Sequence, residues 1–130
     1  MIPLAEIEAA ARNVYAAMPP TPQYAWPLLA ERCGREVWVK HENHTPTGAF
    51  KVRGGITYMD KLRRSGAEVA GVISATRGNH GQSIAVAAAR AGMPEGNSVE
   101  KNAAMRAFGA ELVVHGADFD TAKAHAARLA

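Results

Sequence analysis

Strand-like and helix-like segments alternate along this chain of 130 residues, and no other feature limits its fold as strongly. Strands are predicted at residues 36–40, 70–75 and 111–115, where β-branched and apolar residues cluster. Strands that are separated by helices lie parallel in one sheet, because each helix carries the chain back across a face of that sheet. The expected fold class is therefore α/β: an open, mostly parallel sheet with helices on both faces.

Helices are predicted wherever apolar residues recur at three- and four-residue steps. Over residues 4–18 these apolar residues share one face, and Pro19 ends the helix. The other predicted helices lie at about 51–66, 83–91, 99–108 and 119–129. Between the first helix and the first strand, residues 21–27 are predicted to be an extended connector, and residues 28–33 a short strand or turn.

The alternation breaks after the Ala-rich helix that is predicted at 83–91. Only Gly-Met-Pro-Glu-Gly-Asn separates Ala91 from Ser98, which is suited to cap the next helix. Polar and turn-forming residues of this kind cannot form the buried strand that a parallel sheet requires between two helices. We therefore interpret the sequence as one from which an internal strand is missing.

The composition is that of an ordinary globular protein, with mixed charges and a net charge of +3. No block of like charges predicts a nucleic-acid-binding arm. There is no signal-peptide pattern and no apolar stretch near the ~20 residues that span a bilayer. We expect neither a nucleic acid nor a membrane as partner, and a cytoplasmic location. The histidines show no metal-ligand spacing, and Cys33, the one cysteine, cannot form an internal disulfide.

Residues 47–54 read Thr-Gly-Ala-Phe-Lys-Val-Arg-Gly and place Lys51 in a Gly-rich turn. A lysine that forms an imine must attack as the neutral amine, which burial or a neighbouring cation favours. Phe50 supplies an apolar wall and Arg53 a nearby positive charge, and the glycines let a flat ring approach the backbone. Taken alone, the run fits a solvated helix start better than an imine-forming lysine.

A second unusual run, Ser-Ala-Thr-Arg-Gly-Asn-His-Gly-Gln at residues 74–82, joins the predicted strand at 70–75 to the Ala-rich helix. In open parallel sheets, ligands bind where the carboxyl end of a strand meets the beginning of a helix. Free backbone N–H groups and the positive end of the helix dipole suit an anion such as a carboxylate there. The alternative is a loop that only caps the helix.

Together, the two runs are similar to the motifs of a known family. Residues 40–55 resemble the cofactor-lysine motif of the serine/threonine dehydratases, which belong to the tryptophan-synthase β-like group (fold type II) of pyridoxal-phosphate enzymes. Residues 74–82 resemble the Ser-x-Gly-Asn-His loop of that family. Further matches at Thr21-Pro22 and at 94–109 extend the resemblance over nearly the whole chain from about Thr21.

The resemblance implies a pyridoxal 5'-phosphate cofactor and a small amino-acid substrate. Lys51 would form an imine with the cofactor and act as acid and base at the substrate α-carbon. Phe50 would lie against the cofactor, and Asn79 would hydrogen-bond its ring 3-oxygen. Backbone N–H groups of the second run would bind the substrate carboxylate, namely those of Thr76, Arg77, Gly78 and His80. The implied reaction is β-elimination of water from L-threonine, L-serine or a related hydroxy amino acid, then hydrolysis to a 2-oxo acid and ammonia.

Members of this family have two domains and are more than twice as long as this chain. By resemblance, residues 1–56 belong to the large cofactor domain and residues 57–130 to the small α/β domain. The full-length protein would be a homo-oligomer, a dimer or a tetramer. Because nothing here resembles the family's glycine-rich loop for the cofactor phosphate, we expect an N-terminal fragment that is inactive by itself.

Other readings of the same motifs stay open. Arg77 stands where many members have a small residue, which indicates a different or more acidic substrate. A serine-racemase-like enzyme, a β-replacement enzyme on the same fold and a non-catalytic, truncated binding domain are the alternatives. His80 favours a dehydratase or racemase, since β-replacement enzymes usually carry threonine at that position.

Overall fold

The computed structural model of the protein describes residues 1–69, 71–76, 78–91, 107–111, 113 and 115–130. Its helices and strands follow the chain in the order α1 (Leu4–Tyr15), β1 (Gln23–Ala25), α2 (Pro27–Cys33), β2 (Trp38–Lys40), the 3-10 helix η1 (Glu42–His44), α3 (Lys51–Arg64), α4 (Asn79–Arg90) and α6 (Phe119–Leu129). The predicted helices at the beginning of the chain, after Lys51 and at the end of the chain are thereby confirmed. The Ala-rich helix is also present, but it begins at Asn79 instead of Ser83.

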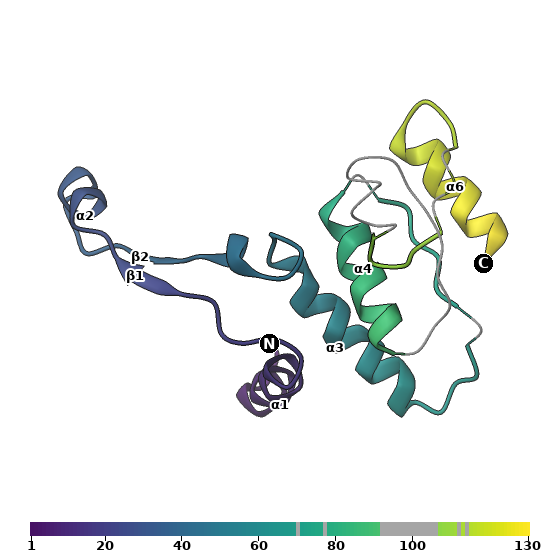
Figure 1. The fold of residues 1–130 in the computed structure, drawn as a ribbon, viewed down its shortest axis with the longest axis horizontal. Helices are drawn as coiled ribbons and strands as arrows, with labels where there is room; N and C mark the ends of the chain where they lie inside the picture. The colour runs from purple at the N-terminus through teal and green to yellow at the C-terminus, as the bar shows by residue number, and fades with distance from the viewer. Residues whose placement is uncertain (70, 77, 92–106, 112, 114) are drawn as a thin grey trace.

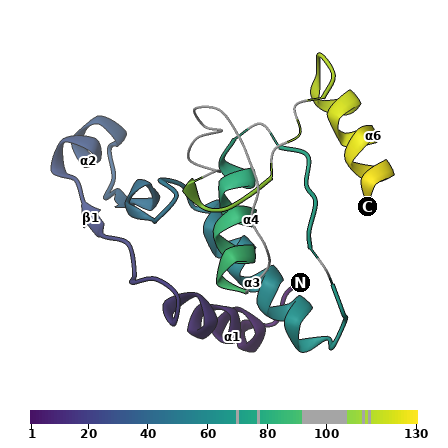
Figure 2. The ribbon, with the colours of Figure 1, turned by 45° about the vertical axis from the view of Figure 1, so that its right-hand side comes forward.

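The strands β1 and β2 form an antiparallel pair, in which Gln23 lies opposite Lys40 and Ala25 opposite Trp38. With α2 between them they make an arm, residues 23–40, that extends away from α1, α3 and α4 (Figures 1 and 2). The predicted strand at 36–40 is therefore confirmed in a shorter form. The segment predicted as an extended connector contains its partner strand.

Residues 28–33 were expected to form a short strand or turn, and this prediction is wrong, because they lie in the helix α2. Pro27 is at the first helical position, where its missing N–H leaves no hydrogen bond unmade. Gly34 ends the helix with a φ of 65°, a left-handed conformation that glycine adopts without a steric penalty. The two ends of α2 are thus set by residues that flank the segment.

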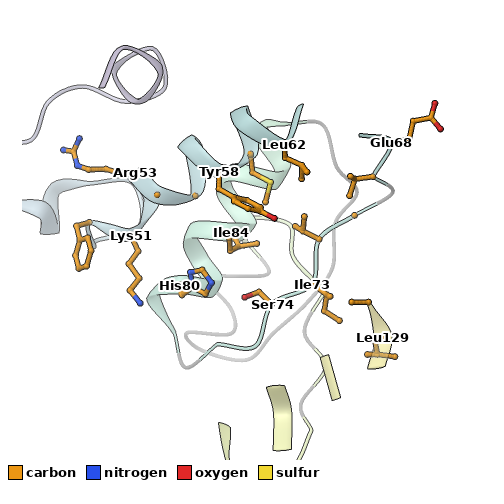
Figure 3. Close-up of a pocket in the computed structure, with 18 residues that line it drawn as sticks. Lys51, Arg53, Tyr58, Leu62, Glu68, Ile73, Ser74, His80, Ile84 and Leu129 are labelled. Atoms are coloured by element: carbon orange, nitrogen blue, oxygen red, sulfur yellow. The ribbon is translucent and has the colours of Figure 1, made fainter. Parts of the chain in front are cut away.

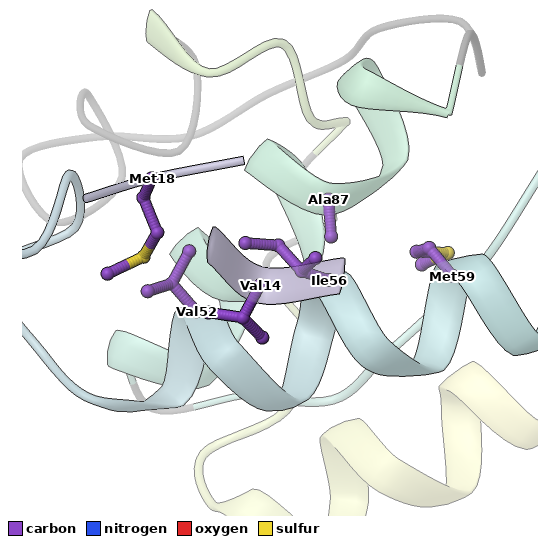
Figure 4. Packing of buried hydrophobic residues seen from close by; sticks show 6 residues of the cluster. All are labelled: Val14, Met18, Val52, Ile56, Met59 and Ala87. Atoms are coloured by element: carbon purple, nitrogen blue, oxygen red, sulfur yellow. The ribbon is translucent and has the colours of Figure 1, made fainter. Parts of the chain in front are cut away.

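The core lies where α1, α3 and α4 meet. It is formed by six apolar side chains that are at least nine-tenths buried: Val14, Met18, Val52, Ile56, Met59 and Ala87 (Figure 4). Val52 is fully buried, and it sits in the first turn of α3 directly after Lys51. The beginning of α3 is therefore held by the core and not only by the loop before it.

The helices α3 and α4 approach each other most closely at Gly55. A Cβ atom added to Gly55 would lie 2.5 Å from Ser83 Oγ and 2.6 Å from the backbone oxygen of Ser83. No side chain larger than hydrogen fits at this point. The pair Gly55 and Ser83 therefore sets the distance between the two helices that carry the two sequence motifs.

The open parallel sheet is not formed by the described residues, whose one sheet is the antiparallel pair of β1 and β2. Residues 71–75, predicted as a buried strand, have no regular secondary structure, and the same holds for residues 111, 113 and 115. Most of the predicted helix at 99–108, and the six residues before Ser98, lie outside the described residues. In the described ranges, no helix combines the length and the apolar character needed to cross a membrane.

Candidate active site

Lys51 is the first residue of α3 and follows a hydrogen-bonded turn at residues 45–49. The Thr45 hydroxyl accepts the N–H of Ala49 at 2.9 Å and donates to the Ala49 carbonyl oxygen at 2.8 Å. Gly48 has a φ of 64°, which residues with a Cβ atom rarely adopt. Because Thr45 and Ala49 are buried, this turn fixes where α3 begins and where the Lys51 side chain leaves the backbone.

A second hydrogen-bonded turn precedes α4. The Thr76 hydroxyl accepts the N–H groups of Gly78 at 3.1 Å and of Gly81 at 2.9 Å. It thereby satisfies donors at the beginning of the helix, as an N-cap threonine does. Gly78 has a φ of 148°, again a conformation suited to glycine. This turn presents Asn79 and His80 as exposed residues on the first turn of α4.

The two turns meet at a cleft of about 1280 Å³. Phe50 and Lys51 line it from the beginning of α3, His80 lines it from the beginning of α4, and Ser74 lines it from the segment before α4 (Figure 3). Further along, α3 contributes Arg53, Tyr58 and Leu62, and other parts of the walls are formed by residues 68–69 and 71–73, Ile84 and the end of α6. Residues of both sequence motifs therefore share one cleft.

Not every predicted site residue lines this cleft. Thr76, Gly78 and Asn79 belong to the loop and helix start beside it but are not among its lining residues. The N–H of Gly78 donates to the Thr76 hydroxyl. Arg77 lies outside the described residues. The binding roles of these four residues stay predictions.

Arg53, which was expected as a positive charge near Lys51, lines the same cleft, but its guanidinium is paired with Glu42. The Lys51 amine and the Arg53 guanidinium point in opposite directions from the first turn of α3 (Figure 3). Arg53 donates to both carboxylate oxygens of Glu42, from Nε at 2.7 Å and from Nη2 at 2.9 Å. These hydrogen bonds lower the pKa of the Glu42 carboxyl from its ordinary value of 4.5 to about 2. The charge of Arg53 is therefore compensated by Glu42.

Residues 14–130 match the family model described as pyridoxal-phosphate dependent enzyme. The chain belongs to this family. Both turns and the described residues that line the cleft fall inside the matched range. The cofactor of this pyridoxal-phosphate dependent enzyme family is pyridoxal 5'-phosphate, as the sequence motifs predicted.

The relatives of this family member include enzymes that act on threonine. The biosynthetic L-threonine dehydratase of Haemophilus influenzae is 38% identical over 123 residues, which cover 90% of this chain and 24% of that protein. Two solved structures superpose over 98% of this chain and 42% of their own chains. They are a pyridoxal 5'-phosphate-dependent aspartate racemase (TM-score 0.83, 28% identity) and a threonine deaminase from T.th. (TM-score 0.82, 29% identity). The fold class is α/β, and the chain spans about a quarter of the length of the Haemophilus relative.

The cleft fits the ring and the aldehyde of pyridoxal phosphate. The Lys51 side chain brings a primary amine, which is the nucleophile that an aldehyde requires. Beside it, Phe50 offers an aromatic ring that is 62% exposed. A Cβ added at Gly54 would meet no heavy atom within 4 Å, so open space reaches the backbone of α3. The space beside Gly54 and the exposed ring of Phe50 suit a flat aromatic ring.

Sequence reasoning missed the wall of the cleft that lies beyond the two motifs. Lys51, Gly54, Tyr58 and Leu62 all line it and are spaced by three and four residues along α3. Residues with this spacing share one face of a helix. That spacing is visible in the sequence, but the helix was predicted from Ile56, Met59 and Leu62, and the face that carries Lys51, Gly54 and Tyr58 was not singled out.

Proposed function

We propose that this chain carries the lysine-bearing part of a pyridoxal-phosphate-dependent ammonia-lyase. Its substrate would be L-threonine, L-serine or a related hydroxy amino acid, and its products a 2-oxo acid and ammonia. The observation that carries the proposal is that Lys51 and His80, from two distant motifs, line one cleft. The 38% identity to a threonine dehydratase supports threonine as the first substrate to test.

Pyridoxal phosphate, when bound, supplies an electron sink for the negative charge that develops at the substrate α-carbon. Lys51 would hold the cofactor through its amine and move the proton at the α-carbon. The Cα–H and Cβ–O bonds break and water leaves; a later addition of water releases ammonia and the 2-oxo acid. Lys51 would act as base in the first step, the role that the family resemblance implies for it, and its position in the lining of the cleft supports this.

The other predicted residues would bind and orient the substrate and the cofactor. Phe50 would pack against the cofactor ring, and Asn79 would hydrogen-bond the ring 3-oxygen. The carboxylate of the substrate would lie against the loop that leads into α4, bound by Thr76, Arg77, Gly78 and His80. This proposal is supported by the position of the loop at the N-terminal end of α4, where the helix dipole favours an anion.

The remaining proposals concern the whole protein. Residues 1–56 would belong to a large cofactor domain and residues 57–130 to a small domain, with α3 continuing through the boundary as one helix. The open parallel sheet, a dimeric or tetrameric assembly, and a cytoplasmic location are further proposals. The family resemblance supports the sheet and the assembly.

A second function, amino-acid racemisation, is favoured by one observation. The aspartate racemase structure superposes on this chain as closely as the threonine deaminase does. Both reactions begin by removal of the proton at the α-carbon. They differ in the next step, because a racemase returns the proton to the opposite face and a lyase expels the β-hydroxyl.

The test uses the product of the complete reading frame, reconstituted with pyridoxal phosphate. Borohydride reduction followed by peptide mass analysis is expected to locate the cofactor on Lys51. Incubation with L-threonine or L-serine is expected to release ammonia and a 2-oxo acid in equal amounts, and Lys51→Ala is expected to abolish both results. Formation of D-amino acid without ammonia would assign the racemase function instead. A cofactor bound to another lysine would contradict the proposed site.

A further inference from the structure

Glu42 is the centre of a hydrogen-bonded network that joins four segments of the chain. Arg53 donates to both of its oxygens, at 2.7 Å and 2.9 Å. Thr21 donates its hydroxyl to Oε1 at 2.6 Å, and the Lys40 amine lies 3.9 Å from the same oxygen. The Lys40 amine also donates to the Thr21 carbonyl oxygen at 3.3 Å. Arg53 is in turn stacked over the ring of Tyr15, 5.7 Å from its centroid.

The pair of Glu42 and Arg53 is a bidentate ion pair, which is among the stronger contacts between protein side chains. Both side chains are about one-quarter exposed, at 22% and 24%, and the guanidinium meets the carboxylate through two N–H groups. Asp60 is another paired carboxylate, and its partners Arg63 and Arg64 are more than 70% exposed. Pairs whose arginine is exposed contribute little, whereas a bidentate pair that is shielded on both sides restrains geometry.

Arg53 follows Lys51 by two residues in the same helical turn. At about 100° per residue the two side chains leave α3 roughly 200° apart. Figure 3 shows the result, with the Lys51 amine directed to one side and the Arg53 guanidinium to the other. Whatever holds Arg53 in place therefore sets the rotation of this first turn about the helix axis, and with it the direction of Lys51.

The first turn of α3 is held at two further points. The Ser83 hydroxyl donates to the backbone oxygen of Lys51 at 2.5 Å, and the side chain of Val52 is fully buried in the core. These contacts fix the turn toward α4 and α1. The contact of Arg53 with Glu42 fixes the same turn toward the loop that follows β2. Lys51, which lines the cleft, lies in this turn.

We infer that Glu42 and Arg53 form a positioning pair that holds the Lys51 amine in the cleft. Neither residue needs to touch the cofactor or the substrate for this role. The inference rests on the proposed function, since it names what keeps the proposed catalytic lysine in its working direction. Thr21 supports the pair by donating to Glu42.

The test compares variants of the holoenzyme made from the complete reading frame. Glu42→Gln keeps the size of the side chain and removes the charge that holds Arg53. A displacement of a reacting group by ~1 Å costs on the order of 100-fold in rate, so we expect kcat to fall by about 10- to 100-fold with a smaller change in KM. The rate at which pyridoxal phosphate attaches to Lys51, measured by borohydride trapping and peptide mass analysis, is expected to fall as well.

Asp60→Asn is the matched control, because it removes a carboxylate paired with Arg64 at 2.8 Å on the same helix α3. It is expected to leave both the trapping rate and kcat unchanged. Arg53→Lys keeps the charge but loses the bidentate contact, so a partial loss of kcat and of the trapping rate is expected. In a double variant, Glu42→Gln with Arg53→Gln, the loss is expected to be no greater than in the larger single variant, as for two residues that act as one unit.

The inference is overturned if Glu42→Gln has the same borohydride trapping rate and the same kcat as Asp60→Asn. If Glu42→Gln does not fold, Arg53→Lys decides instead, because it keeps the charge and loses the bidentate contact with Glu42. A smaller loss in the same two measurements is then expected, and wild-type values would overturn the inference. The proposed function fails separately, when the wild-type protein attaches no cofactor to Lys51; the inference then fails with it.

Discussion

The hydroxyl of Ser83 in α4 donates a hydrogen bond of 2.5 Å to the backbone oxygen of Lys51 in α3. Ser83 is fully buried, and its own backbone lies against Gly55 one turn further along α3. The helix that carries His80 and the helix that carries Lys51 are therefore fixed to one another by this hydrogen bond and by the close approach of their backbones at Gly55. The width of the cleft between the two motifs depends on this helix pair.

Gly55→Ala is expected to separate the two helices. The new Cβ would lie 2.6 Å from the Ser83 carbonyl oxygen, and a backbone atom cannot turn away as a side chain can. We expect the free energy of unfolding to fall by about 2 kcal/mol or more, in the range for overpacked interiors. Urea denaturation of the cofactor-free protein measures this loss.

The neighbouring residue, Gly54, provides the control for that substitution. Nothing lies within 4 Å of a Cβ added there, and alanine is favoured over glycine within a helix. Gly54→Ala is therefore expected to raise the free energy of unfolding by about 0.5 to 1 kcal/mol. Equal effects at the two positions would contradict the close contact of α3 and α4.

Thr76→Val is expected to loosen the turn before α4. Valine has the shape of threonine but cannot accept the N–H groups of Gly78 and Gly81, which would lose their partner. The expected cost is about 1 to 2 kcal/mol, as for the loss of a helix cap. Thr76→Ser keeps the hydroxyl and should stay close to wild type. Hydrogen exchange at the Gly81 amide reports the change directly, and unchanged protection there would contradict it.

His125 in α6 is expected to titrate below its ordinary value of 6.5. Desolvation is the main cause that lowers the pKa of His125, and the nearby charges of His115 and Arg128 lower it further. The His115 and His125 rings are stacked with their centroids 3.8 Å apart. A lowered pKa in the folded state means that the unfolded chain binds protons more readily than the folded one. The part of the free energy of unfolding that depends on His125 therefore falls as the pH drops through 6.5. NMR titration measures the pKa. His115→Phe keeps an aromatic ring, removes one source of the shift and should raise the pKa of His125.

The helices were predictable from the sequence where their signals are local. The apolar spacing that predicts α1 and α3 is contained within each segment, and so is the Ala-rich run of α4. The helix α2 was missed, because seven residues are too few to show a period, and its signals lie in Pro27 and Gly34 at its ends. The strand β1 was missed because it is defined by pairing with β2, and the residues of one segment alone do not indicate its pairing partner.

The candidate site was predictable to a similar degree. The two motifs marked Lys51 and His80, and the resemblance predicted that they meet. The contact of Gly55 with Ser83 could not be predicted, because it depends on how closely two helices approach. The ion pair of Arg53 could not be predicted for a related reason. Its partner Glu42 lies eleven residues earlier in a polar loop, and no sequence period connects the two.

The contribution of Glu42 to stability is expected to disappear in acid. Arg53 lowers the pKa of the Glu42 carboxyl from 4.5 to about 2, so the pair stabilises the folded protein fully above about pH 4.5 and progressively less as the pH falls toward 2. With partial exposure taken into account, roughly 1 to 3 kcal/mol depends on this ionisation. Glu42→Gln should therefore be less stable than wild type at pH 7, and the difference should shrink by pH 3. Urea denaturation of the cofactor-free proteins at both pH values measures it. Arg53→Gln should follow the same course, and a difference that is equal at both pH values would show that Glu42 is not held ionised by Arg53.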